Sequence, residues 1–497
     1  MTKAVVIGAG FGGLALAIRL QSAGIETTLV EKRDKPGGRA YVYQQDGYTF
    51  DAGPTVITDP SSLAELFALS GQLMEDYVEL LPISPFYRLL WPDGQRFDYV
   101  NDQAELDRQI EAMNPADVAG YRRFLRYSEA VFQEGYVKLG HVPFLDISSM
   151  FRAAPQLAKL QAWRSVYSKI SQYVRDPHLR QALSFHTLLV GGSPFESSSI
   201  YALIHALERK WGVWFPRGGT GALVQGLARL FQDLGGVLRL NTPVNQILTR
   251  DGRAYGVLVE GGEKIEADLV ASNGDVVHTY GRLLRHHARG EAMEKKLRRQ
   301  RFSMSLFVVY FGLKRPPGDL AHHTILFGPE YKALVQAICG GKPLRDDFSL
   351  YLHAPSVTDA SLAPEGRSAY YVLSPVPNLR QPIDWASEGP RYADKILDSL
   401  EERVLPGLRR DLDTLRIFTP ADFATELNSH LGSAFSLEPI LTQSAYFRVH
   451  NRDAVLRNLY FVGAGSHPGA GVPGVVASAK ATAGVILSDL SEQAQAA

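Results

Sequence analysis

Apolar runs alternate with amphipathic segments along the chain. A short apolar run at 5–7 is followed by a segment of small and apolar residues and by a second apolar run at 27–30. The pattern returns at 222–240, where an amphipathic helix precedes a short apolar strand. This alternation predicts an α/β fold with a Rossmann-type domain.

Other apolar stretches predict a second sheet. Residues 302–311, 349–353 and 370–373 run apolar or alternate as strands do. Asp59-Pro60 has the sequence of a helix start, a capping aspartate before a proline, and predicts a helix through Leu69. We therefore expect a mixed sheet roofed by helices beside the Rossmann-type domain.

A Gly-x-Gly-x-x-Gly turn follows the first predicted strand. Gly8 allows the tight turn, Gly10 lets a pyrophosphate approach the backbone, and Gly13 lets the next helix pack closely on the sheet. The phosphates would then lie at the helix N-terminus. Glu31, at the end of the second strand, predicts binding of both ribose hydroxyls and favours NAD or FAD over NADP.

The residues that follow favour a flavin. The loop 32–39 contains glycines that can pass close to a pyrophosphate, and its Arg39 can neutralise the charge. Residues 50–54 are again small, and a second glycine-rich stretch occupies 463–474 near the C-terminus. Two such stretches at opposite ends of the chain predict one cofactor site built from both.

The order of these blocks resembles the flavin amine oxidase superfamily. Within it, residues 458–475 are similar to the signature of the bacterial-type phytoene desaturases, members of the carotenoid and retinoid oxidoreductase family. Residues 51–55, 189–194 and 444–448 add to the resemblance, which covers nearly the whole chain. It implies FAD as the cofactor and a glutathione reductase and amine oxidase-like FAD-binding domain.

The resemblance and the turn chemistry together predict the residues that bind FAD. In this set Val244 is expected to lie against the adenine. The predicted residues are Gly8, Gly10, Phe11, Gly12, Gly13, Glu31, Lys32, Gly38, Arg39, Pro54, Thr55, Val244, Asn273, Gly463, Gly465, Gly471, Val472, Pro473 and Gly474.

The same pattern predicts a discontinuous domain organisation. A chain of 497 residues exceeds the usual size of one core, so we expect more than one domain. The segments are 1–75, 215–285 and 430–497 for the FAD-binding domain, 76–130 and 286–429 for the substrate-binding domain, and 131–214 for a helical lid or membrane-associating region.

Residues 131–203 mix large apolar side chains with basic ones. Such a composition suits helices at a lipid surface, and it suits an internal lid equally well. No apolar run reaches 18 residues, so no membrane span is expected. Because the chain enters its first strand without a leader sequence, we expect a cytoplasmic enzyme that binds a membrane peripherally.

Charge and cysteine content exclude several classes of protein. Lys plus Arg and Asp plus Glu each number 52, without a long run of one sign, so nucleic acid is not an expected partner. Cys339 is the only cysteine, which excludes an internal disulfide and a cysteine-based metal cluster. We expect no metal in the site.

The resemblance implies FAD-dependent desaturation of 15-cis-phytoene. Successive hydride transfers to the flavin with cis–trans isomerisation would give all-trans-lycopene or a near intermediate, with a quinone or oxygen as the electron acceptor. Arg152 and His467 are the candidates for a catalytic side chain. The sequence leaves the number of desaturations, the base, the acceptor and the oligomeric state open.

Other functions on the same scaffold stay open at this stage. They include a C30 desaturase, a carotenoid isomerase or ketolase, and an amine oxidase. A non-catalytic isoprenoid carrier is a further alternative, although intact pyrophosphate motifs at both ends of the chain disfavour it.

Overall fold

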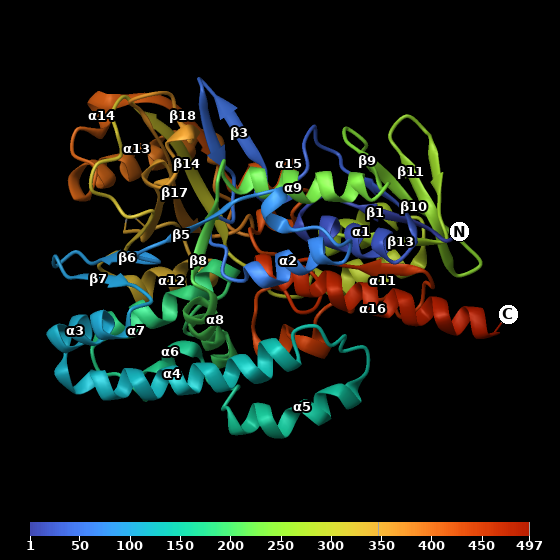
Figure 1. Ribbon diagram of the computed structural model, residues 1–497, viewed down its shortest axis with the longest axis horizontal. Helices are drawn as coiled ribbons and strands as arrows, with labels where there is room; N and C mark the ends of the chain where they lie inside the picture. The colour runs from blue at the N-terminus through green and yellow to red at the C-terminus, as the bar shows by residue number, and fades with distance from the viewer. Residues whose placement is uncertain (346, 497) are drawn as a thin grey trace.

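The computed structural model describes residues 1–345 and 347–496. Its two principal sheets lie toward opposite ends of the long axis, with both chain termini at the end that holds β1 and β13 (Figure 1). Residues 346 and 497, which fall in the predicted segments 286–429 and 430–497, lie outside the described residues.

The first sheet is five-stranded and entirely parallel, in the order β19-β13-β1-β2-β9. Its strands come from all three segments predicted for the FAD-binding domain. They are β1 (Lys3–Ile7), β2 (Glu26–Val30), β9 (Val237–Arg239), β13 (Leu269–Ser272) and β19 (Leu459–Phe461).

Both faces of this sheet are buried, which explains its short, continuous apolar strands. Helices α1 (Phe11–Ser22), α9 (Thr220–Asp233) and α16 (Val472–Ala496) pack on one face. The other face meets the antiparallel strands β10 (Val244–Arg250) and β11 (Arg253–Val259). The Rossmann-type α/β fold predicted from the sequence is confirmed.

The second sheet has seven strands in the order β18-β14-β17-β16-β15-β6-β7. Of its pairings, β15 with β6 is parallel and the others are antiparallel, so the predicted mixed sheet is confirmed. The strands are β6 (Tyr87–Leu90), β7 (Arg96–Tyr99), β14 (Ser305–Leu313), β15 (His323–Leu326), β16 (Leu350–His353), β17 (Ser368–Val376) and β18 (Leu412–Phe418).

The two faces of the mixed sheet bury different partners, as period-two alternation requires. Phe307, Leu352 and Val372 pack with α13 (Trp385–Arg403) on one face. Val308, Tyr351 and Tyr371 belong to the cluster on the other face, which a layer of helices covers. These helices are α3 (Gln103–Met113), α4 (Val118–Phe132), α5 (Ile147–Lys159), α6 (Val166–Ile170), α7 (Pro177–Ser184) and α8 (Leu203–Trp211).

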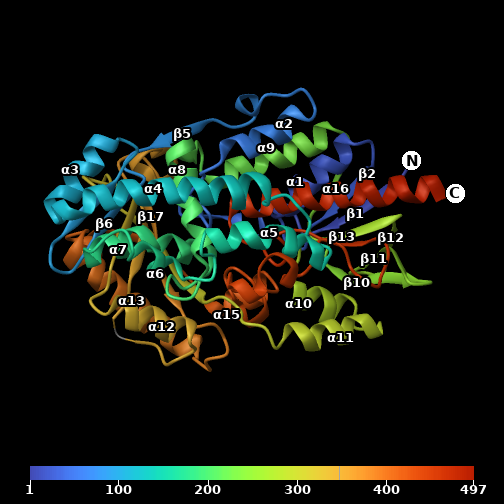
Figure 2. The same ribbon diagram turned by 90° about the horizontal axis from the view of Figure 1, so that it is seen from below.

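Figures 1 and 2 both show α4 and α5 on the outside of this helical layer. None of the helices within the described ranges combines the length and the apolar character needed to cross a bilayer. The remaining elements are β3 (Val42–Gln45), β4 (Tyr48–Asp51), β5 (Leu80–Ile83), β8 (Val213–Pro216), β12 (Lys264–Glu266), α2 (Pro60–Ala68), α10 (Val276–His278), α11 (Ala288–Leu297), α12 (Tyr331–Cys339), α14 (Leu408–Asp411) and α15 (Pro420–Glu426).

Local chemistry explains where two of the helices begin. The Asp59 side chain accepts a hydrogen bond from the Ser62 amide at 3.1 Å, so α2 starts as predicted, with Pro60 in its first turn. Helix α16 begins at Val472 and includes Pro473. Proline is tolerated there because the first helical amides need no intrahelical acceptor.

Gly13 sets the distance between α1 and the sheet. A Cβ atom at this position would lie 1.9 Å from the carbonyl oxygen of Gly8, closer than any van der Waals contact allows. Gly484, in α16, provides a contrast because a Cβ there would meet nothing within 4 Å.

We expect Gly13→Ala to lower the free energy of unfolding by about 3 kcal/mol or more, since backbone must move to admit the methyl group. Gly484→Ala is the matched control and should be neutral or stabilising by up to about 1 kcal/mol. Chemical denaturation of both variants measures the difference. Equal stability of the two variants would contradict this account of the packing.

Candidate functional site

One cavity of about 600 Å³ connects the two halves of the molecule. At one end its wall is the glycine-rich turn between β1 and α1, and at the other it is the inner face of the mixed sheet. Continuity of the two ends means that a nucleotide cofactor and an apolar ligand could meet inside the protein.

Most of the predicted cofactor residues line this cavity. Gly13, Gly463 and Gly465 do not line the cavity. Because glycine has no Cβ atom, neighbouring protein atoms pack directly against these three positions. The predicted residues in the lining are Gly8, Gly10, Phe11, Gly12, Glu31, Lys32, Gly38, Arg39, Pro54, Thr55, Val244, Asn273, Gly471, Val472, Pro473 and Gly474.

Glu31 lies at the C-terminal end of β2 with its carboxylate buried against the glycine turn. Its Oε2 accepts a hydrogen bond from the Ala9 amide at 2.8 Å, and its Oε1 accepts one from the Arg33 amide at 3.0 Å. These bonds hold the carboxylate beside the cavity, where its remaining lone pairs can accept ribose hydroxyls.

The basic loop after Glu31 contacts the segment 425–434. Lys32 Nζ donates to the Thr425 carbonyl at 3.0 Å. Arg39 Nε donates to the Ala434 carbonyl at 2.6 Å and Arg39 Nη2 to Ser429 Oγ at 3.1 Å. Burial lowers the pKa of Arg39, and the nearby Asp275 opposes that shift. Arg39 therefore borders the cavity and also anchors the segment that covers it.

The nucleotide end of the cavity fits FAD. The first amides of α1 have no intrahelical acceptor, no side chain caps them and the first turn holds no acid, so they are free to bind phosphate. Asp275, in the same wall, keeps a buried Oδ2 atom that has no hydrogen-bond partner. Helix α16 also begins at the cavity, with Val472 and Pro473 in the lining.

The glycine-rich signature near the C-terminus is held in place by Arg448. This buried side chain donates from Nη2 to the Ala464 carbonyl at 2.6 Å and from Nε to the Ser466 carbonyl at 3.1 Å. Burial lowers the pKa of Arg448. The motif 444–448 thus positions the backbone that follows β19.

Beyond the glycine turn the cavity is mainly apolar. The polar groups at this transition pair with one another: Thr55 Oγ1 lies 2.9 Å from the Tyr351 hydroxyl and 3.0 Å from the Tyr371 hydroxyl. Tyr371 also donates to the Gly53 carbonyl at 3.1 Å. The mixed sheet is therefore tied to the loop that contains Pro54 and Thr55.

Sequence reasoning missed one polar group in the apolar part of the wall. Glu208, on α8, is fully buried and accepts a hydrogen bond from the Tyr87 hydroxyl at 2.7 Å. His186 Nε2 lies 3.2 Å from Glu208 Oε2. The sequence carried no local signal for Glu208, because its contact with Tyr87 joins residues 121 positions apart.

The two candidate catalytic residues lie in different surroundings. His467 lines the cavity, with its ring centroid 5.0 Å from that of Phe144, and burial lowers its pKa to about 4. Arg152 lies on the exposed side of α5, within 3.4 Å of Ser149 Oγ, and is absent from the cavity lining. The structure therefore does not bring Arg152 to the site.

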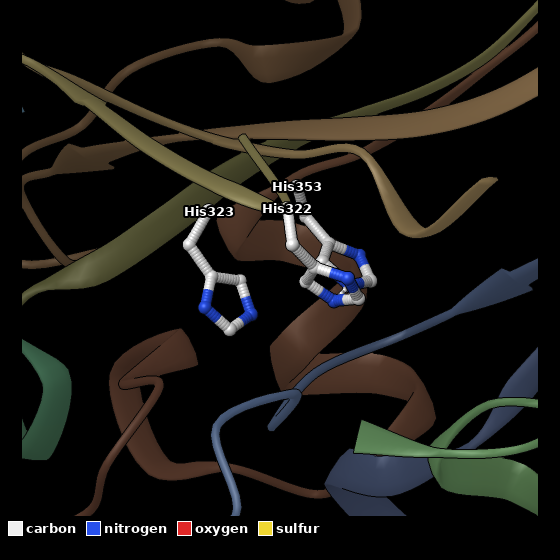
Figure 3. A group of neighbouring side chains, drawn as sticks. All are labelled: His322, His323 and His353. Carbon is white, nitrogen blue, oxygen red and sulfur yellow. Dashed lines mark hydrogen bonds between the residues drawn. The ribbon is translucent and has the colours of Figure 1, made fainter. Parts of the chain in front are cut away.

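Three buried histidines form a separate cluster at the ends of strands β15 and β16 of the mixed sheet (Figure 3). One nitrogen of each ring lies within 4.8 Å of the others. His322 Nδ1 is 2.7 Å from Thr358 Oγ1, and His323 Nδ1 is 3.0 Å from the Phe86 carbonyl oxygen. Burial lowers the pKa of all three, including His353. His322 Nε2 and His353 Nε2 also lie 3.0 Å apart, so we interpret the cluster as a hydrogen-bonded core element.

Comparisons with known proteins agree with this site. Residues 11–487 match the family described as flavin containing amine oxidoreductase. The chain is 63% identical to a phytoene desaturase (lycopene-forming) of Pseudescherichia vulneris, over 99% of this chain and 100% of that protein. It is 44% identical to a phytoene desaturase (neurosporene-forming) of Rhodobacter capsulatus, over 98% of this chain and 94% of that protein.

A solved structure supports the same fold. Cyclohexylamine oxidase from Brevibacterium oxydans superposes with a TM-score of 0.64 at 16% identity, with 99% of each chain covered. The family match, the near-complete coverage and the high identity together show that this chain belongs to the phytoene desaturases within the flavin-containing amine oxidoreductase family.

Proposed function

We propose that the chain is an FAD-dependent enzyme that desaturates phytoene to lycopene in carotenoid biosynthesis. The observation that carries this function is the single cavity that runs from the glycine turn into an apolar interior. Relatives at 62–64% identity over nearly the whole chain are lycopene-forming phytoene desaturases. We further propose that the parallel-sheet half holds FAD and the mixed-sheet half holds the polyene.

The residues of the chain bind and orient the reactants and exclude water from them. When bound, FAD supplies the acceptor for the hydride that leaves an allylic carbon. Glu31, the α1 N-terminus and the loop around Thr55 hold the cofactor in place. The apolar wall excludes water and aligns the hydrocarbon, while the hydroxyls of Tyr351 and Tyr371 pair with Thr55.

Purified protein with FAD and phytoene-containing liposomes tests this function. We expect coloured product that ends at lycopene, identified by chromatography. We propose a quinone or oxygen as the electron acceptor, and anaerobic assays with and without quinone distinguish the two. Flavin-loaded protein that leaves phytoene unchanged would contradict the proposed function, and products of C30 substrates, isomers or ketones would favour the alternative activities.

Glu31 provides a direct test of the cofactor site. We expect Glu31→Gln to weaken FAD binding roughly ten-fold or more, because a hydrogen bond to a charged acceptor contributes about 1.5–3 kcal/mol. Glu26→Gln is the matched control: Glu26 lies on the same strand but is exposed beside Lys3. Fluorescence titration of apoprotein with FAD measures both affinities, and equal affinities would exclude a ribose-binding role for Glu31.

We also propose that the enzyme docks on a membrane surface through an α5 patch. This patch comprises Ile147, Phe151, Trp163 and Phe447, of which Phe151 is 72% and Trp163 62% exposed. Phe447 belongs to a short helical segment that packs against α5. The basic residues Arg152 and Lys159 lie on the same helix, which suits an interface with anionic lipid.

The cavity approaches this patch from inside. Leu157 on α5 and Ala445, in the segment that contains Phe447, both line the cavity. A hydrocarbon that leaves a bilayer at the patch would therefore enter the apolar part of the cavity without crossing water.

We expect the double variant Phe151→Ser/Trp163→Ser to lower binding to vesicles roughly ten-fold or more, since burial of large apolar side chains in lipid drives docking. Leu73→Ser/Val455→Ser is the matched control, because both side chains are 57% exposed and lie outside the patch. Flotation with vesicles of phosphatidylcholine and phosphatidylglycerol measures the bound fraction. Equal loss in the two double variants would argue against this surface.

A further inference from the structure

Four carboxylates line the cavity, and three of them gather at its nucleotide end. Glu31 binds the Ala9 amide, Glu426 pairs with Arg33 at 2.8 Å, and Asp275 caps α10. Glu208 is the fourth, and it lies among apolar lining residues such as Leu207. Its position sets it apart from the cofactor-binding groups.

Binding of a hydrocarbon does not explain why a carboxylate, Glu208, lies in the apolar part of the wall. The side chain is 0% exposed, and burying a carboxylate in an apolar wall costs free energy that a hydrocarbon ligand does not return. Its Oε1 accepts the Tyr87 hydroxyl, whereas its Oε2 makes no hydrogen bond of good geometry. A buried carboxylate oxygen without a hydrogen bond is suited to accept a proton.

We propose that Glu208 is the base for the desaturation, an inference that rests on the proposed function. One hydrogen leaves an allylic carbon with its electron pair and reduces FAD. Glu208 Oε2 takes the hydrogen of the neighbouring carbon as a proton, and the electron pair of that C–H bond becomes the new C=C bond. The substrate loses two electrons and two hydrogens, and the neutral carboxylic acid then passes its proton on before the next step.

Tyr87 and His186 are positioning residues for this base. Burial and the Glu208 charge hold the pKa of Tyr87 well above its ordinary value, so its hydroxyl stays a donor to Oε1 and leaves Oε2 free. His186 Nε2, 3.2 Å from Oε2, is placed to receive the proton. His205, whose ring centroid is 4.3 Å from that of His186, already uses Nδ1 on Tyr99 and Nε2 on the Leu183 carbonyl. With His205 so engaged, the group suits proton transfer better than metal binding.

A continuous contact path joins this base to the cofactor end. The rings of Tyr87 and Tyr351 both stack on His323, with centroid distances of 5.7 Å. The hydroxyl of Tyr351 lies 2.9 Å from Thr55 Oγ1.

The test is Glu208→Gln, which keeps the size of the side chain and an oxygen for Tyr87 but cannot take the proton. We expect anaerobic flavin reduction by phytoene to slow by roughly 10²-fold or more, with FAD content and phytoene binding close to wild type. The wild-type rate should fall toward low pH, and the variant should lose this dependence. Glu208→Asp should recover part of the rate.

Glu438→Gln is the matched control, because Glu438 is also buried but pairs with Arg301 at 2.7 Å outside the cavity lining. It should keep the wild-type rate and pH profile. The proposal would be overturned if phytoene reduced the flavin of the Glu208→Gln variant at the wild-type rate, or if the pH profile of that variant were unchanged. If Glu208→Gln does not load flavin, His186→Gln replaces it, and an unchanged pH profile there overturns the proposal equally. If phytoene does not reduce the flavin of the wild-type enzyme, the result would instead refute the proposed function.

Discussion

At Asn273 the backbones of three distant chain segments approach so closely that glycine is required at the contact points. A Cβ atom on Gly12 would lie 2.6 Å from Asn273 Oδ1, and one on Gly463 would lie 2.3 Å from the same atom. Asn273 Nδ2 donates to the Gly8 carbonyl at 3.2 Å. The first turn, the end of β13 and the end of β19 thus form one rigid unit, and the cofactor end of the cavity exists only when all three have met.

The mixed sheet depends on this unit through a few polar contacts. Thr55 binds Tyr351 and Tyr371, and Arg39 binds the segment that ends at Ala434. Each contact satisfies a buried donor while it places the sheet over the glycine turn. The same bonds remove polar groups from the wall, so the remaining surface suits a hydrocarbon.

Polar side chains inside an apolar cavity are costly, and their placement is therefore informative. The hydroxyls of Tyr351 and Tyr371 are paired, and the histidine cluster around His323 is neutral because burial lowers its pKa values. Glu208 differs from the paired hydroxyls because one of its carboxylate oxygens is buried without a hydrogen bond of good geometry. The proposed chemistry uses this difference, since a hydrocarbon offers no group of its own to accept a proton.

Local patterns were enough to predict much of this protein. The glycine turn, Glu31, the Asp59 helix start, strands β1, β2 and β9 of the parallel sheet and strands β14, β16 and β17 of the mixed sheet follow from turn chemistry and hydrophobic periodicity, which act over a few residues. The family signature added the cofactor. Tertiary packing alone decided the partners of Arg39, the exposed position of Arg152 and the meeting of Tyr87 with Glu208, which lie 121 residues apart. Such contacts depend on how α8 docks against β6, and no local spacing encodes that docking.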